Sequence, residues 1–355
     1  MNTTSSNPTT AVRKGEELDW QALDRHLKSV LPDLEGEAEI SQFAGGASNL
    51  TYRLKYETDD LVVRRPPFGT KAKTAHSMIR EYRIMNALKP VYPSVPDTLY
   101  YSDDKSIIGS EFYVMRKVDG VLIRNRIPVE WNFTKEDTRR FCNSFWEKLM
   151  ELHQVDYLEA GLEDFGKPEG YVKRQILGWN RRFERVITPD VDSFSAVRDW
   201  LVASMPADSI RPSILHGDYR IDNVIVDRDD PCKILAVLDW EICAVGDPLM
   251  DLGNSLAYWI QDDDPAELKH LVVQPSNAPG MLTRGQILDL YQQRTGIDIP
   301  DFRFYLVYGY WRLCVILQQI YFRYFHGQTQ DERFSTFGVA AQNLGEHCQR
   351  LMLGR

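Results

Sequence analysis

The spacing of hydrophobic and polar positions changes along the chain. In the first part, short runs rich in β-branched and aromatic residues alternate with turn residues, a pattern that predicts strands. We expect strands within residues 39–57, 60–68 and 110–120, where Gly and Pro mark the turns. Helical spacing predicts helices over residues 18–31 and 74–90. The order of these elements indicates an antiparallel sheet with one inserted helix, an α+β unit.

The rest of the chain is mainly helical. Amphipathic patterns predict helices over residues 135–156 and 172–187, and the strand signal returns only at 223–227 and 234–240. We therefore predict an α+β fold with a small antiparallel-sheet N-lobe and a larger, mainly helical C-lobe. The predicted parts are a disordered lead-in over residues 1–15, an N-lobe over 16–118 and a C-lobe over 119–355.

One apolar segment is long enough to raise the question of a membrane helix. Residues 302–322 read FRFYLVYGYWRLCVILQQIYF, but two Arg and two Gln interrupt the run. Spanning a bilayer takes about 20 consecutive, predominantly apolar residues. We therefore predict a buried core helix here and no membrane partner. The first ten residues are polar, so we do not expect a secretory signal.

Composition and charge narrow the class of partner. The chain has 355 residues, which favours two lobes over one core. Its formal net charge of −9 disfavours nucleic acid as a partner and would suit a cationic substrate. The five Cys include no CxxC pair, which predicts free thiols in a reducing compartment and no zinc site. We expect a cytoplasmic protein.

A dense polar cluster precedes one of the C-lobe strands. The stretch LHGDYRIDNVIVD, residues 215–227, places His216, Asp218 and Asn223 in the spacing His-x-Asp-x-x-x-x-Asn. A second apolar run leads into Asp239. If the two runs form a hairpin, Asn223 and Asp239 lie at the same end of two strands. Taken singly, such residues are typical of turns and helix caps.

Phosphoryl transfer requires a set of side chains of this kind. One carboxylate must accept or orient the proton of the attacking hydroxyl, while an Asn and a second Asp hold Mg²⁺ against the phosphates. Oxygen ligands without His or Cys suit Mg²⁺ rather than Zn²⁺. The order and spacing therefore favour a catalytic role over turn formation. His216 is expected to shape the loop through a buried hydrogen bond.

The motif resembles the catalytic core of the protein-kinase-like fold, in the form used by the aminoglycoside phosphotransferase and choline kinase-like family. HGDYRIDNVIVD, followed by LDWEICAVGDPLMDLG, is similar to that family's signature. The resemblance implies a two-lobe protein-kinase-like fold with ATP and Mg²⁺ as cofactors. It implies Asp218 as the catalytic base, Asn223 and Asp239 as metal ligands, and Asp251 as a support of the loop. Arg220 is the implied stabiliser of the transferring phosphate, with an exposed loop Arg as the alternative.

The resemblance places the nucleotide in the N-lobe. The segment FAGGASN joins two predicted strands and departs from the kinase pattern G-x-G-x-x-G, so a plain hairpin turn is the alternative to a phosphate loop. Adenine is implied to bond with backbone groups between Arg116 and Val118. The implied phosphate-loop residues are Gly45, Gly46, Ser48 and Asn49.

LVVR occupies the position of the kinase V-A-I-K and ends in Arg64 where Lys is expected. Because successive strand residues face opposite ways, only one of Arg64 and Arg65 points inward, and the register favours Arg64. The implied carboxylate partner is Glu81 on the following helix. A surface ion pair between Glu81 and a neighbour such as Arg80 is the alternative.

The acceptor is expected to be a small hydroxylated molecule. Only a short segment separates Asp239 from Asp247, without the longer activation loop and A-P-E of protein kinases. Aromatic residues near acids such as Glu241 and Asp264 would suit a cation, although most of them are expected to pack in the core. LVVRRPP and REYRIMNAL look most like the kinase-like domains found next to acyl-CoA dehydrogenases. That likeness implies a hydroxyacyl-CoA as an alternative acceptor.

The predicted function is therefore an ATP- and Mg²⁺-dependent O-phosphotransferase acting on a small molecule. The alternative from another class is a catalytically silent kinase-like protein that binds nucleotide or a partner protein. The Arg at position 64 motivates that alternative, and the complete set of Asp218, Asn223 and Asp239 argues against it. A metal-dependent hydrolase using the same carboxylates is a further alternative.

Overall fold

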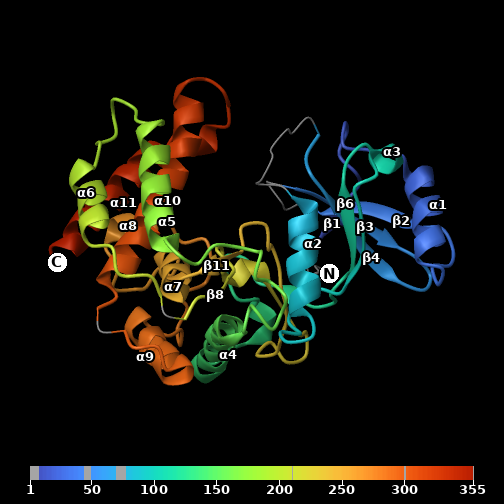
Figure 1. Ribbon diagram of the computed structural model, residues 1–355, viewed down its shortest axis with the longest axis horizontal. Coiled ribbons are helices and arrows are strands. Elements are labelled where there is room, and N and C mark those ends of the chain that lie inside the picture. Colours follow the sequence, from blue (N-terminus) through green and yellow to red (C-terminus); the bar gives the residue numbers. More distant parts are fainter. Residues whose placement is uncertain (1–7, 44–48, 69–76, 210, 300, 355) are drawn as a thin grey trace. The chain divides into compact units, whose positions relative to one another are not determined.

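A computed structural model of the chain describes residues 8–43, 49–68, 77–209, 211–299 and 301–354 (Figure 1). The contacts divide the chain into two compact units. Unit 1 comprises Met1–Leu122, Ala160–Leu162 and Asn223–Ile242, and unit 2 comprises Ile123–Glu159, Glu163–Asp222 and Cys243–Arg355. These units differ from the predicted lobes, which meet at residue 118. Unit 1 also contains a hairpin from the later part of the sequence.

Unit 1 is built on an antiparallel sheet with the strand order β1-β2-β3-β4-β6-β5. This sheet confirms the antiparallel N-lobe that the sequence predicts. The strands are β1 Thr9–Thr10, β2 Glu39–Phe43, β3 Leu50–Lys55, β4 Asp60–Arg65, β5 Thr98–Ser102 and β6 Phe112–Arg116. The accompanying helices are α1 Trp20–Val30, α2 Met78–Leu88 and α3 Lys105–Ile108.

The two faces of this sheet carry different side chains. Tyr52, Leu54 and Val63 lie on one face and form a buried cluster with Leu23 and Leu27 of α1. In Figure 1, α2 and α1 lie on opposite sides of the sheet. Since neighbouring residues on a strand face opposite sides, every second residue of β4 and β6 is directed toward the α2 side. This alternation decides which polar side chains of the sheet can meet α2.

The prediction of a disordered lead-in over residues 1–15 is wrong at residues 9 and 10, which form β1. Thr9 and Thr10 pair with Phe43 and Gln42 of β2. The N–H of Arg13 then donates to the side-chain oxygen of Gln42 at 2.9 Å. Pairing at a sheet edge uses backbone groups, so a polar segment without apolar periodicity can still form a strand.

A hairpin in unit 1 confirms the pairing expected from the two later apolar runs. Strands β9 Val224–Val226 and β10 Ile234–Val237 are antiparallel, and β9 also pairs with β7 Val121–Leu122. The N–H of Leu238 donates to the carbonyl oxygen of Asn223 at 2.8 Å. Asn223 precedes β9 and Asp239 follows β10, so both residues lie at the same end of the hairpin.

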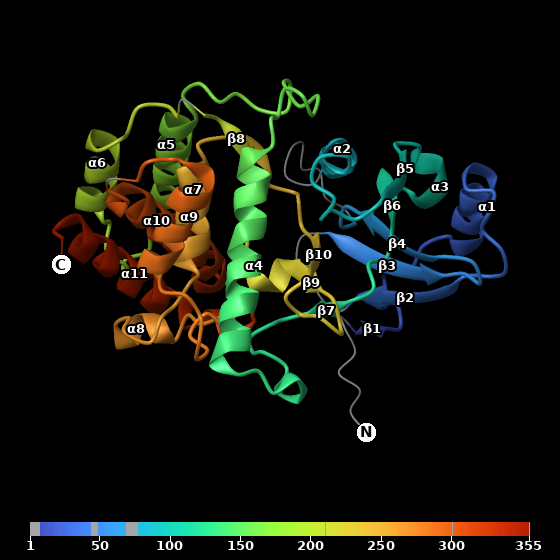
Figure 2. The ribbon, with the colours of Figure 1, turned by 90° about the horizontal axis from the view of Figure 1, so that it is seen from below.

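Unit 2 is mainly helical, with one two-stranded antiparallel sheet. Figure 2 shows the full length of α4, which contacts α9 and β8. Its helices are α4 Lys135–Gln154, α5 Tyr171–Glu184, α6 Ser195–Ala203, α7 Pro248–Ala257, α8 Ala266–Lys269, α9 Arg284–Thr295, α10 Arg303–Phe325 and α11 Phe337–Met352. Its strands are β8 Ser213–Leu215 and β11 Ala244–Gly246, and the short 3₁₀ turns of the chain are η1 Val129–Trp131, η2 Ile221–Asn223 and η3 Glu332–Phe334.

Helix α10 confirms the buried core helix predicted over residues 302–322. It packs against α11, α7 and α5, and Tyr308 and Trp311 are fully buried. A Cβ at Gly309 would lie 2.2 Å from the carbonyl oxygen of Gly253, so α7 and α10 cross where only glycine fits. None of the helices in the described ranges is sufficiently long and apolar to cross a membrane.

Candidate active site

Arg64 on β4 reaches two carboxylates within unit 1. Its Nε lies 3.3 Å from Oε2 of Glu81, and its Nη2 lies 3.4 Å from Oδ1 of Asp239. The side chain of Glu81 is only 1% exposed, so solvent screens this pair weakly. Burial opposes the charge on Arg64, but attraction from Tyr113, Glu81 and Asp239 outweighs it and raises the pKa of Arg64. The guanidinium therefore stays protonated, and it links α2 to the hairpin end.

Arg65 faces the other side of the sheet, as strand alternation predicts. Its Nη1 donates to the carbonyl oxygen of Ile108 at 3.1 Å, and its guanidinium lies 3.9 Å from the ring of Phe68. Of the two neighbouring arginines, Arg64 contacts Glu81 and Arg65 does not. The burial of Glu81 excludes the alternative of a surface ion pair with a helical neighbour.

Glu81 accepts two further side-chain hydrogen bonds. The hydroxyl of Tyr113 donates to Oε2 at 2.9 Å, and Nδ2 of Asn49 donates to Oε1 at 3.0 Å. The same Nδ2 lies 3.2 Å from Oε2 of Glu241. A buried carboxylate requires such donors, because an ionised group without partners is costly in the interior. Glu81 is thereby fixed in position for its ion pair with Arg64.

The phosphate-loop prediction can be followed only at its last residue. Gly45, Gly46 and Ser48 lie outside the described residues. Asn49 is buried, and its side-chain amide contacts Glu81 and Glu241.

Two backbone N–H groups of the segment predicted to contact adenine, residues 116–118, already donate hydrogen bonds within the protein. The N–H of Arg116 donates to Asp97 O at 2.8 Å, and the N–H of Lys117 donates to Asp60 O at 2.7 Å. A base bound along this segment would therefore have to use carbonyl groups or the N–H of Val118.

The hairpin end offers oxygen ligands that fit Mg²⁺. Asn223 is buried, whereas the side chain of Asp239 is 36% exposed. Asp239 also adopts φ +66°, a left-handed conformation that is costly for a residue other than Gly and is enriched at functional sites. Within the described residues, no group of three or more His, Cys, Asp or Glu forms a closed metal cage. Mg²⁺ sites commonly use one or two carboxylates and leave the other positions to water and phosphate.

In unit 2, Asp251 on α7 holds the loop that follows β8. Its Oδ2 accepts the N–H of His216 and its Oδ1 accepts the N–H of Gly217, both at 2.8 Å. His153 Nε2 lies 3.2 Å from the same Oδ2. Burial would raise the pKa of Asp251, but the contacts with His153 and His216 outweigh it and hold that pKa below its ordinary value. Asp251 thus supports the loop, as the resemblance implies.

His216 is buried and shapes the loop, as predicted. The N–H of Asp218 donates to Nδ1 of His216 at 3.2 Å. The intervening Gly217 has φ +84°, a conformation that L side chains rarely adopt. The turn therefore directs the chain from β8 to Asp218.

Arg220 lies among charged and aromatic neighbours of unit 2. Its Nε lies 3.4 Å from Oδ1 of Asp218, and its Nη2 lies 3.2 Å from Oδ2 of Asp222. Its guanidinium lies 4.9 Å from the centre of the Tyr258 ring. The side chain is 21% exposed, which argues against the alternative of an exposed loop Arg. Burial raises the pKa of Asp222 despite the nearby charge of Arg220.

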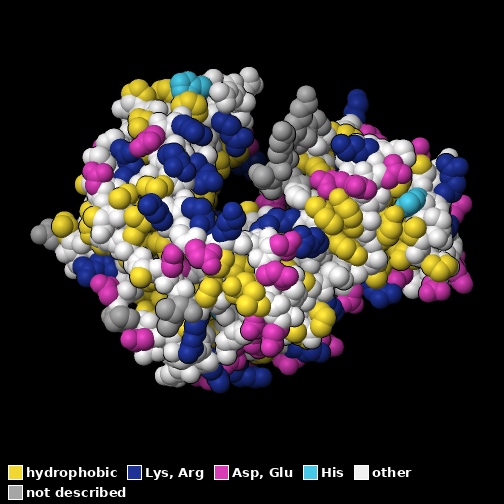
Figure 3. Space-filling view, viewed as in Figure 1, with side chains coloured by type: hydrophobic (Ala, Val, Ile, Leu, Met, Phe, Trp, Pro, Cys, Tyr) yellow, Lys and Arg dark blue, Asp and Glu magenta, His cyan; other side chains and the backbone are white. Residues whose placement is uncertain are grey.

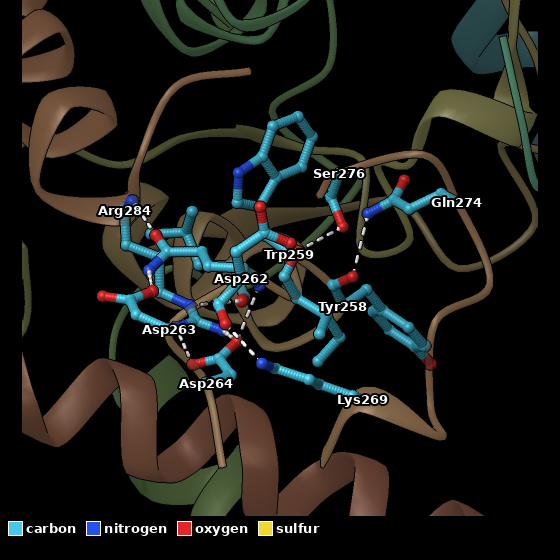
Figure 4. Close-up of polar contacts among 12 residues, drawn as sticks. Tyr258, Trp259, Asp262, Asp263, Asp264, Lys269, Gln274, Ser276 and Arg284 are labelled. Atoms are coloured by element: carbon cyan, nitrogen blue, oxygen red, sulfur yellow. Dashed lines mark hydrogen bonds and ion pairs between the residues drawn. The ribbon is translucent and has the colours of Figure 1, made fainter. Parts of the chain in front are cut away.

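Gln274 connects this loop to the segment after α7, and no pattern in the sequence indicates this role. Its Oε1 accepts the N–H of Ile221 at 2.9 Å, and its Nε2 donates to the carbonyl oxygen of Tyr258 at 3.1 Å. Figure 4 shows Gln274 beside Tyr258, with Ser276 nearby. A lone Gln in an irregular segment has no distinguishing pattern in the sequence. By its bond to the backbone of Tyr258, Gln274 helps to position the aromatic ring that lies under the guanidinium of Arg220.

Asp264 is not available as an acid for a cationic acceptor. Both of its carboxylate oxygens accept from the guanidinium of Arg284 at 2.7 Å (Figure 4). Tyr305, one of the aromatic residues of the C-terminal helices, donates to Oδ2 of Asp247 at 3.3 Å inside the core. These contacts indicate that Asp264 and Tyr305 stabilise the fold of unit 2 and do not bind the acceptor.

Comparison with known proteins identifies a matching protein family and similar proteins. Residues 39–284 match the family described as the phosphotransferase enzyme family. Acyl-CoA dehydrogenase family member 11 of Gallus gallus is 31% identical over 349 residues, an alignment that covers 95% of this chain but 44% of that relative. The chain therefore spans less than half the length of this relative.

Two solved structures have the same fold. A crystal structure from Ralstonia eutropha, provisionally assigned as an aminoglycoside phosphotransferase, has a TM-score of 0.81 at 29% identity and covers 95% of this chain and 99% of that one. A ternary complex of a thermostable mutant of aminoglycoside phosphotransferase APH(4)-Ia with AMP-PNP and hygromycin B has a TM-score of 0.59 at 14% identity, with coverages of 94% and 99%. The kinase-like fold and the family resemblance predicted from the sequence are confirmed.

Proposed function

Because the chain belongs to the phosphotransferase enzyme family, we propose that it is an ATP- and Mg²⁺-dependent O-phosphotransferase that acts on a hydroxyl group of a small molecule. The observation that carries this proposal is the hairpin end of unit 1. There Asn223 precedes β9 and Asp239 follows β10, so both lie at one end of the paired strands, and Arg64 contacts Asp239 while paired with Glu81. The APH(4)-Ia complex, which holds AMP-PNP and hygromycin B, supports a nucleotide and a small acceptor as the two substrates.

Arg64 and Glu81 support the nucleotide-binding part of the proposal. In protein kinases, a strand Lys paired with a helix Glu contacts the phosphates. Here Arg64 makes the corresponding pair with Glu81, which is itself held by Tyr113 and Asn49. A guanidinium presents several donors in a fixed fork, so it can keep its carboxylate and still bind a phosphate oxygen. Arg64 is thus proposed to substitute for the usual Lys.

Asn223 and Asp239 are the residues that would hold the metal. When bound, Mg²⁺ would neutralise the developing charge on the phosphates. Asp239 presents a partly exposed carboxylate from a backbone conformation that the surrounding structure must stabilise.

Asp218 is proposed to accept the proton of the attacking hydroxyl. Its side chain is 22% exposed, so it is accessible, and its backbone N–H donates to Nδ1 of His216. Arg220 Nε lies 3.4 Å from Oδ1 of Asp218, and Arg220 is proposed to stabilise the transferring phosphate.

A catalytically silent protein of this fold is the alternative. The argument for this alternative was the Arg at position 64 in place of Lys. That argument is weak, because Arg64 keeps the ion pair with Glu81. The presence of Asp218, Asn223 and Asp239 in the family spacing also favours an enzyme. Relatives described as acyl-CoA dehydrogenase family members support a hydroxyacyl-CoA as a candidate acceptor, beside an aminoglycoside-like one.

An acceptor panel tests the proposal. We expect ADP formation from ATP and Mg²⁺ to rise at least tenfold with one class among aminoglycosides, choline, sugars and hydroxyacyl-CoAs, and to stop when EDTA removes the metal. The assay is a coupled measurement of ADP on the full chain. ATP binding without turnover on any acceptor would favour the silent protein, and acceptor cleavage without nucleotide would favour a hydrolase.

A further inference from the structure

Arg312 on α10 is a buried cation that none of the roles above uses. It is 7% exposed, and in the ranges that the structure describes its guanidinium makes neither a hydrogen bond nor an ion pair. Its guanidinium carbon lies 5.4 Å from the centre of the Trp179 ring. A buried charge without a paired anion is costly in the protein interior. Such a residue requires a compensating role.

A second arginine shares the same aromatic ring. The guanidinium carbon of Arg182 lies 4.5 Å from the ring of Trp179. Burial lowers the pKa of Arg182, and repulsion from Arg181, Arg312 and Arg185 adds to this effect against attraction from Tyr308. Positive charges are therefore crowded around Trp179 instead of being neutralised.

Helix α5 extends this positive region onto the surface. Among its described neighbours, neither Arg181, Arg182 nor Arg185 has a carboxylate partner within ion-pair distance, and all three are exposed. Figure 3 shows Lys and Arg side chains gathered over the part of unit 2 where α5 runs. The whole chain has a net charge of −9, so this local excess of cations is not a consequence of composition.

The buried arginine lies within electrostatic reach of the catalytic loop. Burial opposes the charge on Arg312, but Tyr258, Tyr308 and Asp218 act against it and raise the pKa of Arg312. Tyr258, whose charge acts on Arg312, has its ring 4.9 Å from the guanidinium of Arg220. All of these residues belong to unit 2. Asp218 and Arg312 are therefore near enough within unit 2 for their charges to interact.

We propose that Arg312 and Arg182 bind an anionic group of the acceptor, a carboxylate or a phosphate, beside the loop that carries Asp218. This inference rests on the proposed function and names its acceptor class as anionic hydroxylated molecules. Arginine forks match both anions with two parallel hydrogen bonds, and Trp179 holds the two guanidinium groups in place. The pairing of Asp264 with Arg284 agrees with this class, because it removes an acid that a cationic acceptor would need.

The test is a calorimetric titration of the full chain with inorganic phosphate at constant ionic strength, repeated with acetate. We expect R312Q to weaken phosphate binding at least tenfold and R182Q about threefold. The control is R323Q, which removes an exposed arginine from the last turn of the same helix and is expected to stay within twofold of the wild type. The anion that binds more tightly identifies the group.

A parallel titration with ATP separates this inference from the proposed function. ATP binding that is equal in all variants, together with Arg312-dependent anion binding, supports both. Phosphate and acetate binding that is absent in the wild type, or unchanged in R312Q and R182Q, overturns the anion site even if ATP binds. Arg312-dependent anion binding in a protein that binds no nucleotide would keep the anion site and refute the phosphotransferase. Because Arg182 is exposed, R182Q keeps the test valid if R312Q fails to fold.

Discussion

Asp218→Asn is expected to lower kcat on the best acceptor about 10³-fold while leaving the Kd for ATP within a factor of about three. The amide keeps the shape of the side chain but cannot accept the hydroxyl proton. The measurement is ADP formation at saturating ATP and Mg²⁺, with calorimetric titration of ATP for the same variant. Asp218 lies in a loop fixed through His216, so the substitution should leave the fold intact.

The matched control is Asp229→Asn in the exposed turn of the β9–β10 hairpin, which should retain wild-type activity. Full activity of Asp218→Asn would show that another group accepts the proton and would remove the base assignment.

Asp251→Ala is expected to lower the free energy of unfolding by about 3 kcal/mol, since removal of a buried charged partner typically costs 3–5. The substitution leaves the N–H groups of His216 and Gly217 without their acceptor and His153 without its carboxylate. Urea unfolding measures the change. Asp289→Ala, on the exposed side of α9, is the control and should change stability by less than about 0.5 kcal/mol.

The pH dependence of this stability difference has a defined sign. The pKa of Asp251 is lowered in the folded protein, so its contribution is present above the unfolded value of about 3.9 and is lost as pH falls through the folded pKa. The difference between wild type and Asp251→Ala should therefore be constant from about pH 5 to 8 and shrink below about pH 4. A difference that grows on acidification would mean that Asp251 is not ionised in the fold.

Local patterns in the sequence were sufficient to predict the hairpin end and the orientation of Arg64. The hairpin follows from two apolar runs with a turn between them. Strand alternation places Arg64 and Arg65 on opposite faces, and the register with the kinase V-A-I-K selects Arg64 as the inner one. The helix spacing also predicted α4 and α10 close to their observed bounds. Each of these features depends on residues that are neighbours along the chain.

The residues that the sequence did not indicate act through contacts between distant segments. Tyr113 lies in an apolar strand and is distinguished only by its bond to Glu81 on α2. Gln274, from a later segment of unit 2, accepts the N–H of Ile221, and the charge of Arg312 on α10 interacts with that of Asp218. Strands as short as β1, β7 and β8 have no measurable period, so their pairing depends on tertiary structure.

Titration of the wild-type chain with ATP, with and without Mg²⁺, tests the central claim most directly. The claim is that Arg64, Asn223 and Asp239 form a nucleotide and metal site. It predicts ATP binding that Mg²⁺ strengthens at least tenfold in calorimetry, with AMP binding much more weakly because it lacks the phosphates that Arg64 and the metal would contact. Absence of ATP and GTP binding with or without Mg²⁺, or equal binding in both conditions, would contradict the claim.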